Sequence, residues 1–171
     1  MSETQIRRDL SPLFLRLVLG YGFLFHGFGK LFTAGGHAGF AGLLSGLGVP
    51  FPDLTAWLVG GTEFAGGAAL IAGVLLPIVT PLLTIVMLVA ISTVHLQAGF
   101  NFMNITGMTA AGPQFGLPGF EVNLLYIAGL LSLLFSGPGA ISASALLRRE
   151  SRAEPTRPAG QPIPVRVRGG R

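Results

Sequence analysis

Five ionisable side chains interrupt long apolar stretches of this sequence: His26, Lys30, Glu63, His95 and Glu121. Ionisable groups are costly inside a membrane, so they usually face a protein interior and mark a functional site. Together these five would supply two carboxylates, two imidazoles and one ammonium group. Imidazoles and desolvated carboxylates can exchange protons near neutral pH, and all three kinds of group can hydrogen-bond a polar ligand.

Such a set of side chains supports three interpretations. Glu63 opposite Lys30 or His26 can form a buried ion pair that fixes helix packing. The same groups can relay protons along a transport path. A histidine beside a carboxylate can hydrogen-bond a quinone carbonyl and take up the proton of a quinol. Metal binding by His26, His95, Glu63 and Glu121 is not expected, because no H-x-x-x-H or E-x-x-H pair is present.

The elements that must position these residues are four apolar runs, Leu13–Phe32, Leu54–Leu76, Ile78–Ala98 and Phe120–Phe135. A helix needs about 20 apolar residues to cross the hydrocarbon of a bilayer. The runs predict an all-α, polytopic membrane protein with a four-transmembrane-helix bundle over residues 10–147. Residues 148–171, rich in proline and arginine, are expected to be a disordered basic tail.

Composition places the chain in the membrane class. Only 11% of its residues are charged, against about 25% in soluble domains, and the mean hydropathy is +0.67. The sequence contains no cysteine. This chain therefore cannot form disulfides, use a thiol nucleophile or ligate an iron–sulfur cluster. Any sulfur or redox chemistry must use a cofactor, a substrate or a partner.

The distribution of basic residues predicts the orientation in the membrane. The formal net charge of +4 is concentrated in arginines at the two ends of the chain, and it does not suggest nucleic-acid binding. The two connections Thr33–Asp53 and Gly99–Gly119 contain no lysine or arginine. By the positive-inside rule, both termini are expected in the cytoplasm of a bacterium or archaeon, with the protein in the cytoplasmic membrane.

Alternating helix directions bring the ionisable residues to similar depths. His26, Glu63 and His95 are expected in the outer half of the bilayer, with Lys30 and Glu121 near its outer boundary. If their polar faces turn inward, these five residues form one pocket, for which the three interpretations above remain open. Glu121 has an alternative role as an early-turn carboxylate favoured by the helix dipole.

Two further features concern packing. Gly61, Ala65, Ala69 and Gly73 form a ladder of small residues that predicts close contact with another helix backbone. Arg16 lies inside the first run, and we expect it to snorkel to lipid phosphates, with internal packing as the alternative. Between the runs, residues 34–52 predict a short interfacial helix, and residues 100–115 predict an irregular outer connection.

The order of these motifs resembles the DoxX family of small four-helix bacterial and archaeal membrane proteins. The resemblance covers residues 10–145 and rests on four segments of the printed sequence: R-L-V-L-G-Y-G-F-L-F-H-G-F-G-K-L, G-G-T-E-F-A-G-G-A-A-L-I-A-G, M-L-V-A-I-S-T-V-H-L-Q-A-G-F, and G-F-E-V-N-L-L-Y with the later G-P-G-A-I-S. The polar positions of the family match Arg16, His26, Lys30, Glu63, His95 and Glu121.

The resemblance implies a redox context, because the family takes its name from a subunit linked to thiosulfate:quinone oxidoreductase. Its relatives are associated with sulfur and thiol redox balance. We expect a small membrane redox subunit that contacts lipid, a quinone and a redox-enzyme partner, either alone or as a homo-oligomer. In this interpretation Glu63 and His95 handle protons, while His26, Lys30 and Glu121 hold the ligand. The alternatives are a non-catalytic scaffold that anchors a partner, and a small-solute or proton transporter. The absence of cysteine argues against covalent sulfur transfer by this chain.

Overall fold

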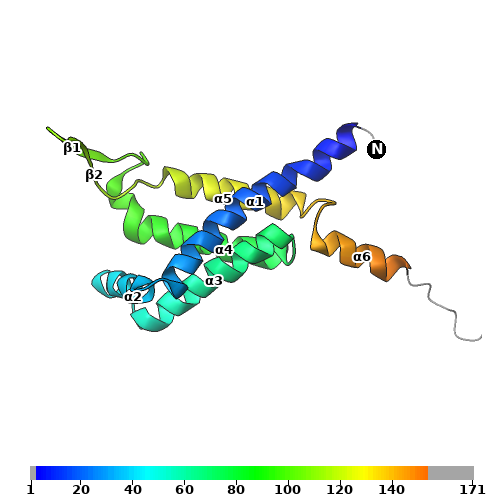
Figure 1. Cartoon of the computed structure of the whole chain (residues 1–171), viewed down its shortest axis with the longest axis horizontal. Helices are drawn as coiled ribbons and strands as arrows, with labels where there is room; N and C mark the ends of the chain where they lie inside the picture. The colour runs from blue at the N-terminus through cyan, green and yellow to red at the C-terminus, as the bar shows by residue number, and fades with distance from the viewer. Residues whose placement is uncertain (1–2, 154–171) are drawn as a thin grey trace, which may run out of the picture.

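The computed structural model describes residues 3–153, which are mainly helical, with one small hairpin (Figure 1). The helical elements are α1 (Glu3–Phe32), α2 (Gly36–Gly46), α3 (Pro52–Ala72), α4 (Leu76–Ala90), η1 (Ile91–His95), η2 (Leu96–Ala98), α5 (Glu121–Ser136) and α6 (Ala143–Ala153). The hairpin pairs β1 (Ile105–Thr109) with β2 (Gly112–Phe115) in antiparallel register.

Within residues 3–153, three helical segments are long and apolar enough to cross a membrane: Leu10–Phe32, Pro52–Ala72 and Leu76–Ala98. They confirm a multi-pass membrane protein and correspond to the first three predicted runs. The fourth run forms α5, an apolar helix of only 16 residues. At about 1.5 Å per residue, α5 is about 24 Å long, shorter than the roughly 30 Å hydrocarbon core of a bilayer.

Helices α1 and α3 are antiparallel and approach each other through glycines. A Cβ added to Gly67 would lie 2.5 Å from the backbone nitrogen of Leu24 and 2.6 Å from the carbonyl oxygen of Gly20. A Cβ added to Gly27 would likewise meet the backbone of α3 near Phe64 and Gly60. These contacts require hydrogen in place of a side chain, since real Cβ atoms do not approach backbone so closely.

The predicted contact of the small-residue ladder with another helix is wrong for Gly61 and Ala65. A Cβ on Gly61 would meet no atom within 4 Å, and Ala65 is exposed. Ala69 packs at the margin of the core, and Gly73 lies beyond the helix as its C-cap, with a φ of 72°. Small residues lie on both faces of α3, and the opposite face, which carries Gly67, is the one that packs against α1.

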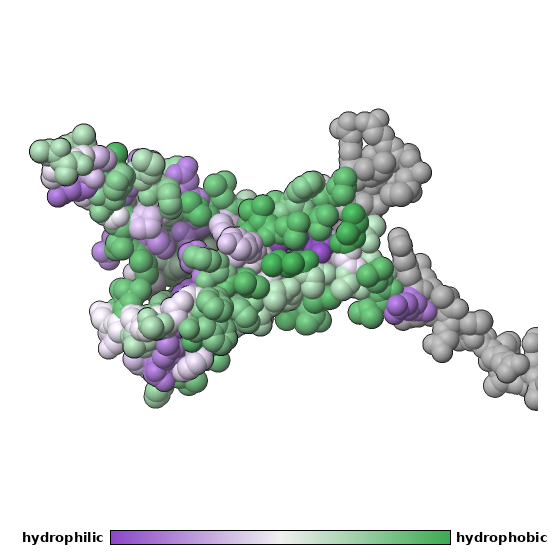
Figure 2. Space-filling model, in the orientation of Figure 1, coloured by the Kyte–Doolittle hydropathy of each residue, from purple (hydrophilic) through white to green (hydrophobic). Residues whose placement is uncertain are grey.

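The core lies where α1, α3, α4 and α5 meet. Its central side chains include Phe23, Leu70, Leu83, Leu130 and Leu133, all almost completely buried. The outer faces of the same helices remain apolar and exposed, and Figure 2 shows hydrophobic residues over the middle of the bundle. Exposed apolar side chains on every long helix are the pattern expected for a surface in contact with lipid.

The interfacial helix predicted within residues 34–52 is present as α2. It packs against α1 and α3, and His37 on α2 contacts two side chains of α3. The Nε2 atom of His37 lies 2.8 Å from Oδ1 of Asp53, and its ring lies 4.4 Å from the ring of Trp57. His37 therefore links α2 to the start of α3.

The outer connection predicted to be irregular contains the β1–β2 hairpin. The turn between the strands ends at Gly112, whose φ of 118° disfavours any residue with a side chain. Exposed apolar residues such as Ile105, Met108 and Phe115 occur on both strands without the polar alternation of a half-buried sheet. This missing alternation is why periodicity does not reveal the strands.

After α5, the chain breaks at residues 137–142 and continues as α6. The predicted boundary of the basic tail at residue 148 therefore falls inside a helix. Residues 154–171, to which the prediction of a disordered tail also applies, lie outside the described residues.

Arg16 does not reach towards lipid phosphates, because its side chain is buried at 2% exposure. Its guanidinium donates hydrogen bonds to the backbone oxygens of Leu70 and Ile71, at 2.9 and 2.6 Å. It also donates to those of Pro138 and Ile141, at 2.6 and 2.7 Å. Snorkelling was the wrong expectation, because backbone oxygens at the end of α3 and in the 137–142 connection face this guanidinium.

Candidate functional site

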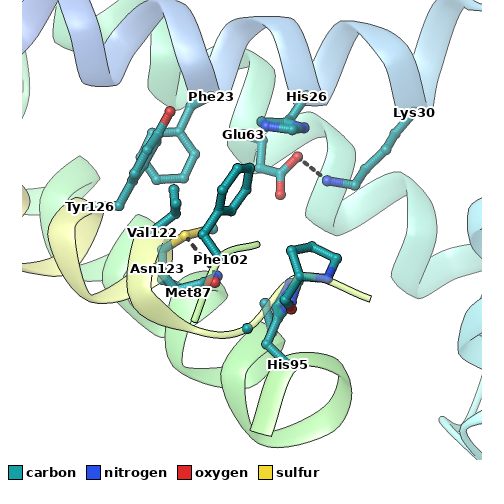
Figure 3. Close-up of a pocket in the computed structure, with 13 residues that line it drawn as sticks. Phe23, His26, Lys30, Glu63, Met87, His95, Phe102, Val122, Asn123 and Tyr126 are labelled. Carbon is teal, nitrogen blue, oxygen red and sulfur yellow. Dashed lines mark hydrogen bonds and ion pairs between the residues drawn. The ribbon is translucent and has the colours of Figure 1, made fainter. Parts of the chain in front are cut away.

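A cavity of about 230 Å³ lies between α1, α3, α4 and α5, and the 99–120 connection covers part of it (Figure 3). Four of the five ionisable residues singled out from the sequence line it, namely His26, Lys30, Glu63 and His95. The remaining lining residues are mostly apolar or aromatic and come from α1, α4, α5 and the 99–120 connection: Phe23, Met87, Ala90, Phe102, Pro118, Gly119, Val122, Asn123 and Tyr126.

Lys30 and Glu63 form an ion pair at one side of this cavity. The Lys30 ammonium donates a hydrogen bond to Oε2 of Glu63, as the dashed line in Figure 3 indicates. Glu63 is only 3% exposed, whereas the Lys30 side chain is 21% exposed. The same ammonium lies 4.9 Å from the ring centroid of Phe40, within cation–π distance. A buried carboxylate requires such compensation, because an isolated buried charge is strongly unfavourable.

Aromatic rings form another wall of the cavity. Phe23 and Tyr126 pack edge to face with ring centroids 5.2 Å apart, joining α1 to α5. In Figure 3 the ring of Phe102 also points into the space between these rings and the ion pair. His26, one turn before Lys30 on α1, also lines the cavity. Rings around a small number of polar groups are typical of sites for planar organic ligands.

His95 enters the cavity from the opposite side, at the end of the five-residue π-helical turn η1. Its Nδ1 atom lies 2.7 Å from the carbonyl oxygen of Pro118. A carbonyl oxygen can only accept, so Nδ1 must carry the proton in this hydrogen bond. In the neutral imidazole, Nε2 is then the acceptor. The π-helical turn changes the direction of the side chains that follow α4, and such turns often occur at functional sites.

Glu121 is not among the residues that line the cavity, contrary to our prediction. Its carboxylate accepts a hydrogen bond of 3.1 Å from the backbone nitrogen of Phe102. The backbone nitrogen of Glu121 in turn donates to the oxygen of Phe100, at 3.0 Å. Glu121 therefore holds the connection that carries Phe102 at the edge of the cavity. This position at the first turn of α5 agrees with the alternative role that its sequence position suggested.

Several residues that line the cavity were not predicted from the sequence. Asn123 is 9% exposed, and its amide nitrogen lies 3.6 Å from the sulfur of Met87. Tyr126 follows one turn later on the same face of α5, with its hydroxyl against the backbone at Gly22. Asparagine and tyrosine inside an apolar run were the available signal. No sequence signal marked Phe102 as a lining residue, because the fold of the long 99–120 connection places it at the cavity.

The arrangement combines hydrogen-bond donors and acceptors on two sides of a small apolar space. One side offers an ammonium, a buried carboxylate and the His26 imidazole, and the other offers Nε2 of His95. The cavity is smaller than the roughly 300–1,000 Å³ of sites for drug-sized ligands. It therefore suits one ring with polar groups at its ends. Among residues 3–153, no group of three or more His, Cys, Asp or Glu side chains is placed to hold a metal ion.

Comparison with protein families found that the model of the DoxX family matches residues 11–96, half of the chain. This segment runs from α1 to the end of η1 and contributes His26, Lys30, Glu63 and His95 to the cavity. Searches of curated proteins and of solved structures gave no match.

Proposed function

The chain belongs to the DoxX family, and we propose that it is a small membrane redox subunit whose cavity binds the ring of a quinone. The observation that carries this proposal is the Lys30–Glu63 ion pair, which is buried at Glu63 yet faces an aromatic-lined cavity. An ion pair that served only to pack helices would not need a cavity beside it. A quinone, when bound, supplies a redox couple of two electrons and two protons.

The donor and acceptor groups of the cavity fit such a ring. The Lys30 ammonium has three donors, of which one is directed at Glu63, so it can also donate to a ligand oxygen. Its positive charge would stabilise negative charge on that oxygen. Nε2 of His95 is placed to accept a hydrogen bond from the opposite side. Phe23, Phe102 and Tyr126 would pack against the ring.

In this proposal the residues of the chain bind the ring and move protons. Glu63 and Nε2 of His95 accept protons, and Lys30 with His26 holds the ligand oxygen. Electrons pass to or from a redox-enzyme partner that binds the outer surface. We further propose that α5 completes a fourth crossing. It runs from the His95 end of the bundle to the 137–142 connection that Arg16 holds, which supports both termini lying on the cytoplasmic side.

Substitution of Glu63 by glutamine tests the proposed role, because the change removes charge while keeping shape. We expect the Glu63→Gln protein to fold and to lose binding of a short-chain ubiquinone, measured by calorimetry in nanodiscs. Asp53→Asn is the matched control, since it makes the same chemical change at the exposed His37 pair outside the cavity. This control should bind the probe like the unaltered protein.

A purely structural ion pair would behave differently. Glu63→Gln would then leave Lys30 uncompensated and lower the free energy of unfolding by about 3–5 kcal/mol. Combining it with Lys30→Met would restore the stability that each single change removes. That outcome, or a stable Glu63→Gln protein with unchanged ubiquinone binding, would contradict the proposal. Purification in mild detergent with a stoichiometric soluble partner and no quinone would instead favour the scaffold alternative.

A further inference from the structure

Helix α6 begins at the membrane boundary, where hydrogen bonds hold it against the end of α3. The Ser144 hydroxyl donates to the carbonyl oxygen of Gly73 at 2.7 Å, and Gly73 directly follows the membrane-crossing segment Pro52–Ala72. Ser142 caps the first turn of α6, accepting a hydrogen bond of 3.2 Å from the backbone nitrogen of Ala145. The start of α6 is therefore fixed close to the depth at which hydrocarbon gives way to headgroups.

The sides of α6 differ in character. Leu146 is 58% exposed, and Arg148 is also exposed. Two residues along a helix correspond to a rotation of about 200°, so these side chains lie on nearly opposite sides. An 11-residue helix is shorter than the roughly 12–15 residues at which isolated helices become even marginally stable in water. Helix α6 therefore needs a surface that covers its apolar side.

The charge of this region indicates what that surface is. From Ala143 to Arg171 the chain contains seven arginines and only two glutamates, so this segment carries the whole excess of positive charge. Three of the arginines, Arg148, Arg149 and Arg152, belong to α6 itself. Anionic phospholipid headgroups attract basic residues next to a membrane-crossing helix. An apolar groove on a protein could cover Leu146, but it would not explain the excess of positive charge in this segment.

We propose that α6 lies in the membrane interface, with Leu146 in the acyl boundary and Arg148 on anionic phospholipid headgroups. Basic amphipathic helices bind membranes in this way, through buried apolar area together with attraction to anionic lipid. The arrangement would anchor the end of the bundle where the Arg16 carbonyl cluster and the 137–142 connection lie. This proposal does not depend on quinone binding.

Spin labelling tests the position of α6 directly, because the chain has no native cysteine. Nitroxide labels at Leu146→Cys and Arg148→Cys would be compared in nanodiscs that contain phosphatidylglycerol. We expect the label at residue 146 to collide with lipid-soluble oxygen and to be shielded from a water-soluble nickel chelate. The label at residue 148 should show the opposite preference. In nanodiscs of phosphatidylcholine alone, residue 146 should become more accessible to nickel.

Two reference labels calibrate these measurements. Phe14→Cys lies on an exposed part of the α1 span and reports lipid, whereas Ala110→Cys lies at the exposed hairpin turn and reports water. Thermal unfolding checks that each labelled protein is folded. The proposal is wrong if residue 146 is as accessible to nickel as residue 110 in phosphatidylglycerol. Shielding from both oxygen and nickel would place α6 on protein instead, and an insensitivity to phosphatidylglycerol would exclude the headgroup contact.

Discussion

Arg16 is the buried cation that the cavity does not use. Its guanidinium joins α1 to α3 and to the connection before α6 through four backbone oxygens. Two of these oxygens, on Leu70 and Ile71, belong to the last turn of α3, where carbonyls lack partners within the helix. The negative end of the helix dipole favours a cation at the same place. Arg16 is therefore a structural residue of the bundle.

Replacing Arg16 by glutamine should destabilise the protein strongly. Each hydrogen bond from a charged group contributes about 1.5–3 kcal/mol, and the shorter side chain cannot reach all four oxygens. We expect the free energy of unfolding to fall by at least about 3 kcal/mol, measured by denaturant unfolding in detergent. Arg148→Gln is the matched control, because an exposed substitution should change stability by no more than about 0.5 kcal/mol. Equal losses in the two variants would contradict the buried role.

His95 offers a separate test of the proposed ligand contact. In His95→Asn, the side-chain amide nitrogen can replace Nδ1 in the hydrogen bond to Pro118, but nothing replaces Nε2. This variant should keep its thermal stability and bind ubiquinone about tenfold more weakly, equivalent to about 1.4 kcal/mol. A Kd equal to that of the unaltered protein would show that Nε2 does not contact the ring.

Between helices, the closest packing is that of α1 on α3. Gly67→Ala should lower the free energy of unfolding by about 1–3 kcal/mol, because the new methyl group would lie 2.5 Å from the Leu24 nitrogen. Gly61→Ala makes the same change on the open face of the same helix and should be neutral or stabilising by up to about 1 kcal/mol. Thermal unfolding in detergent would compare them, and a larger loss from Gly61→Ala would mean that this face packs against another surface.

These contacts show what the sequence could predict. The apolar runs located the long helices because hydrocarbon demands continuous apolar length. The alternating helix directions then predicted that His26, Lys30, Glu63 and His95 lie together. The position of a residue along its helix follows from its residue number, so this part of the site could be predicted. Rotation of α3 could not be predicted, because glycine and alanine occur on both of its faces. Glu121 was misplaced for a related reason, because the 99–120 connection determines which group its carboxylate meets.

Arg16 escaped prediction for another reason. Its hydrogen-bond acceptors are backbone oxygens, and every residue has one, so no sequence pattern identifies these acceptors. The β1–β2 hairpin was missed because its strands lack alternation between polar and apolar residues. Pocket residues on loops, such as Phe102, depend on tertiary contacts that local sequence does not encode.

For the protein in its membrane, the distribution of arginine predicts both termini in the cytoplasm. Reporter fusions after Leu147 should therefore give a cytoplasmic signal, whereas fusions within residues 35–48 or 104–114 should report the outside. The physical reason is the cost of moving positively charged flanks across the membrane during insertion. A cytoplasmic signal from either outer connection would overturn this orientation and the fourth crossing by α5.

The hydrogen bonds of Arg16 also constrain the order of synthesis. Arg16 lies in α1, which is synthesised before α3 and α5, but Pro138 and Ile141, which accept from it, follow 122 and 125 residues later. Until these two residues have been synthesised, the guanidinium lacks half of its final acceptors. An uncompensated charge within the membrane is energetically unfavourable. Helix α1 can therefore complete this set of hydrogen bonds only after Pro138 and Ile141 have been made. A nascent chain that stops short of residue 138 should remain a substrate for membrane proteases and chaperones.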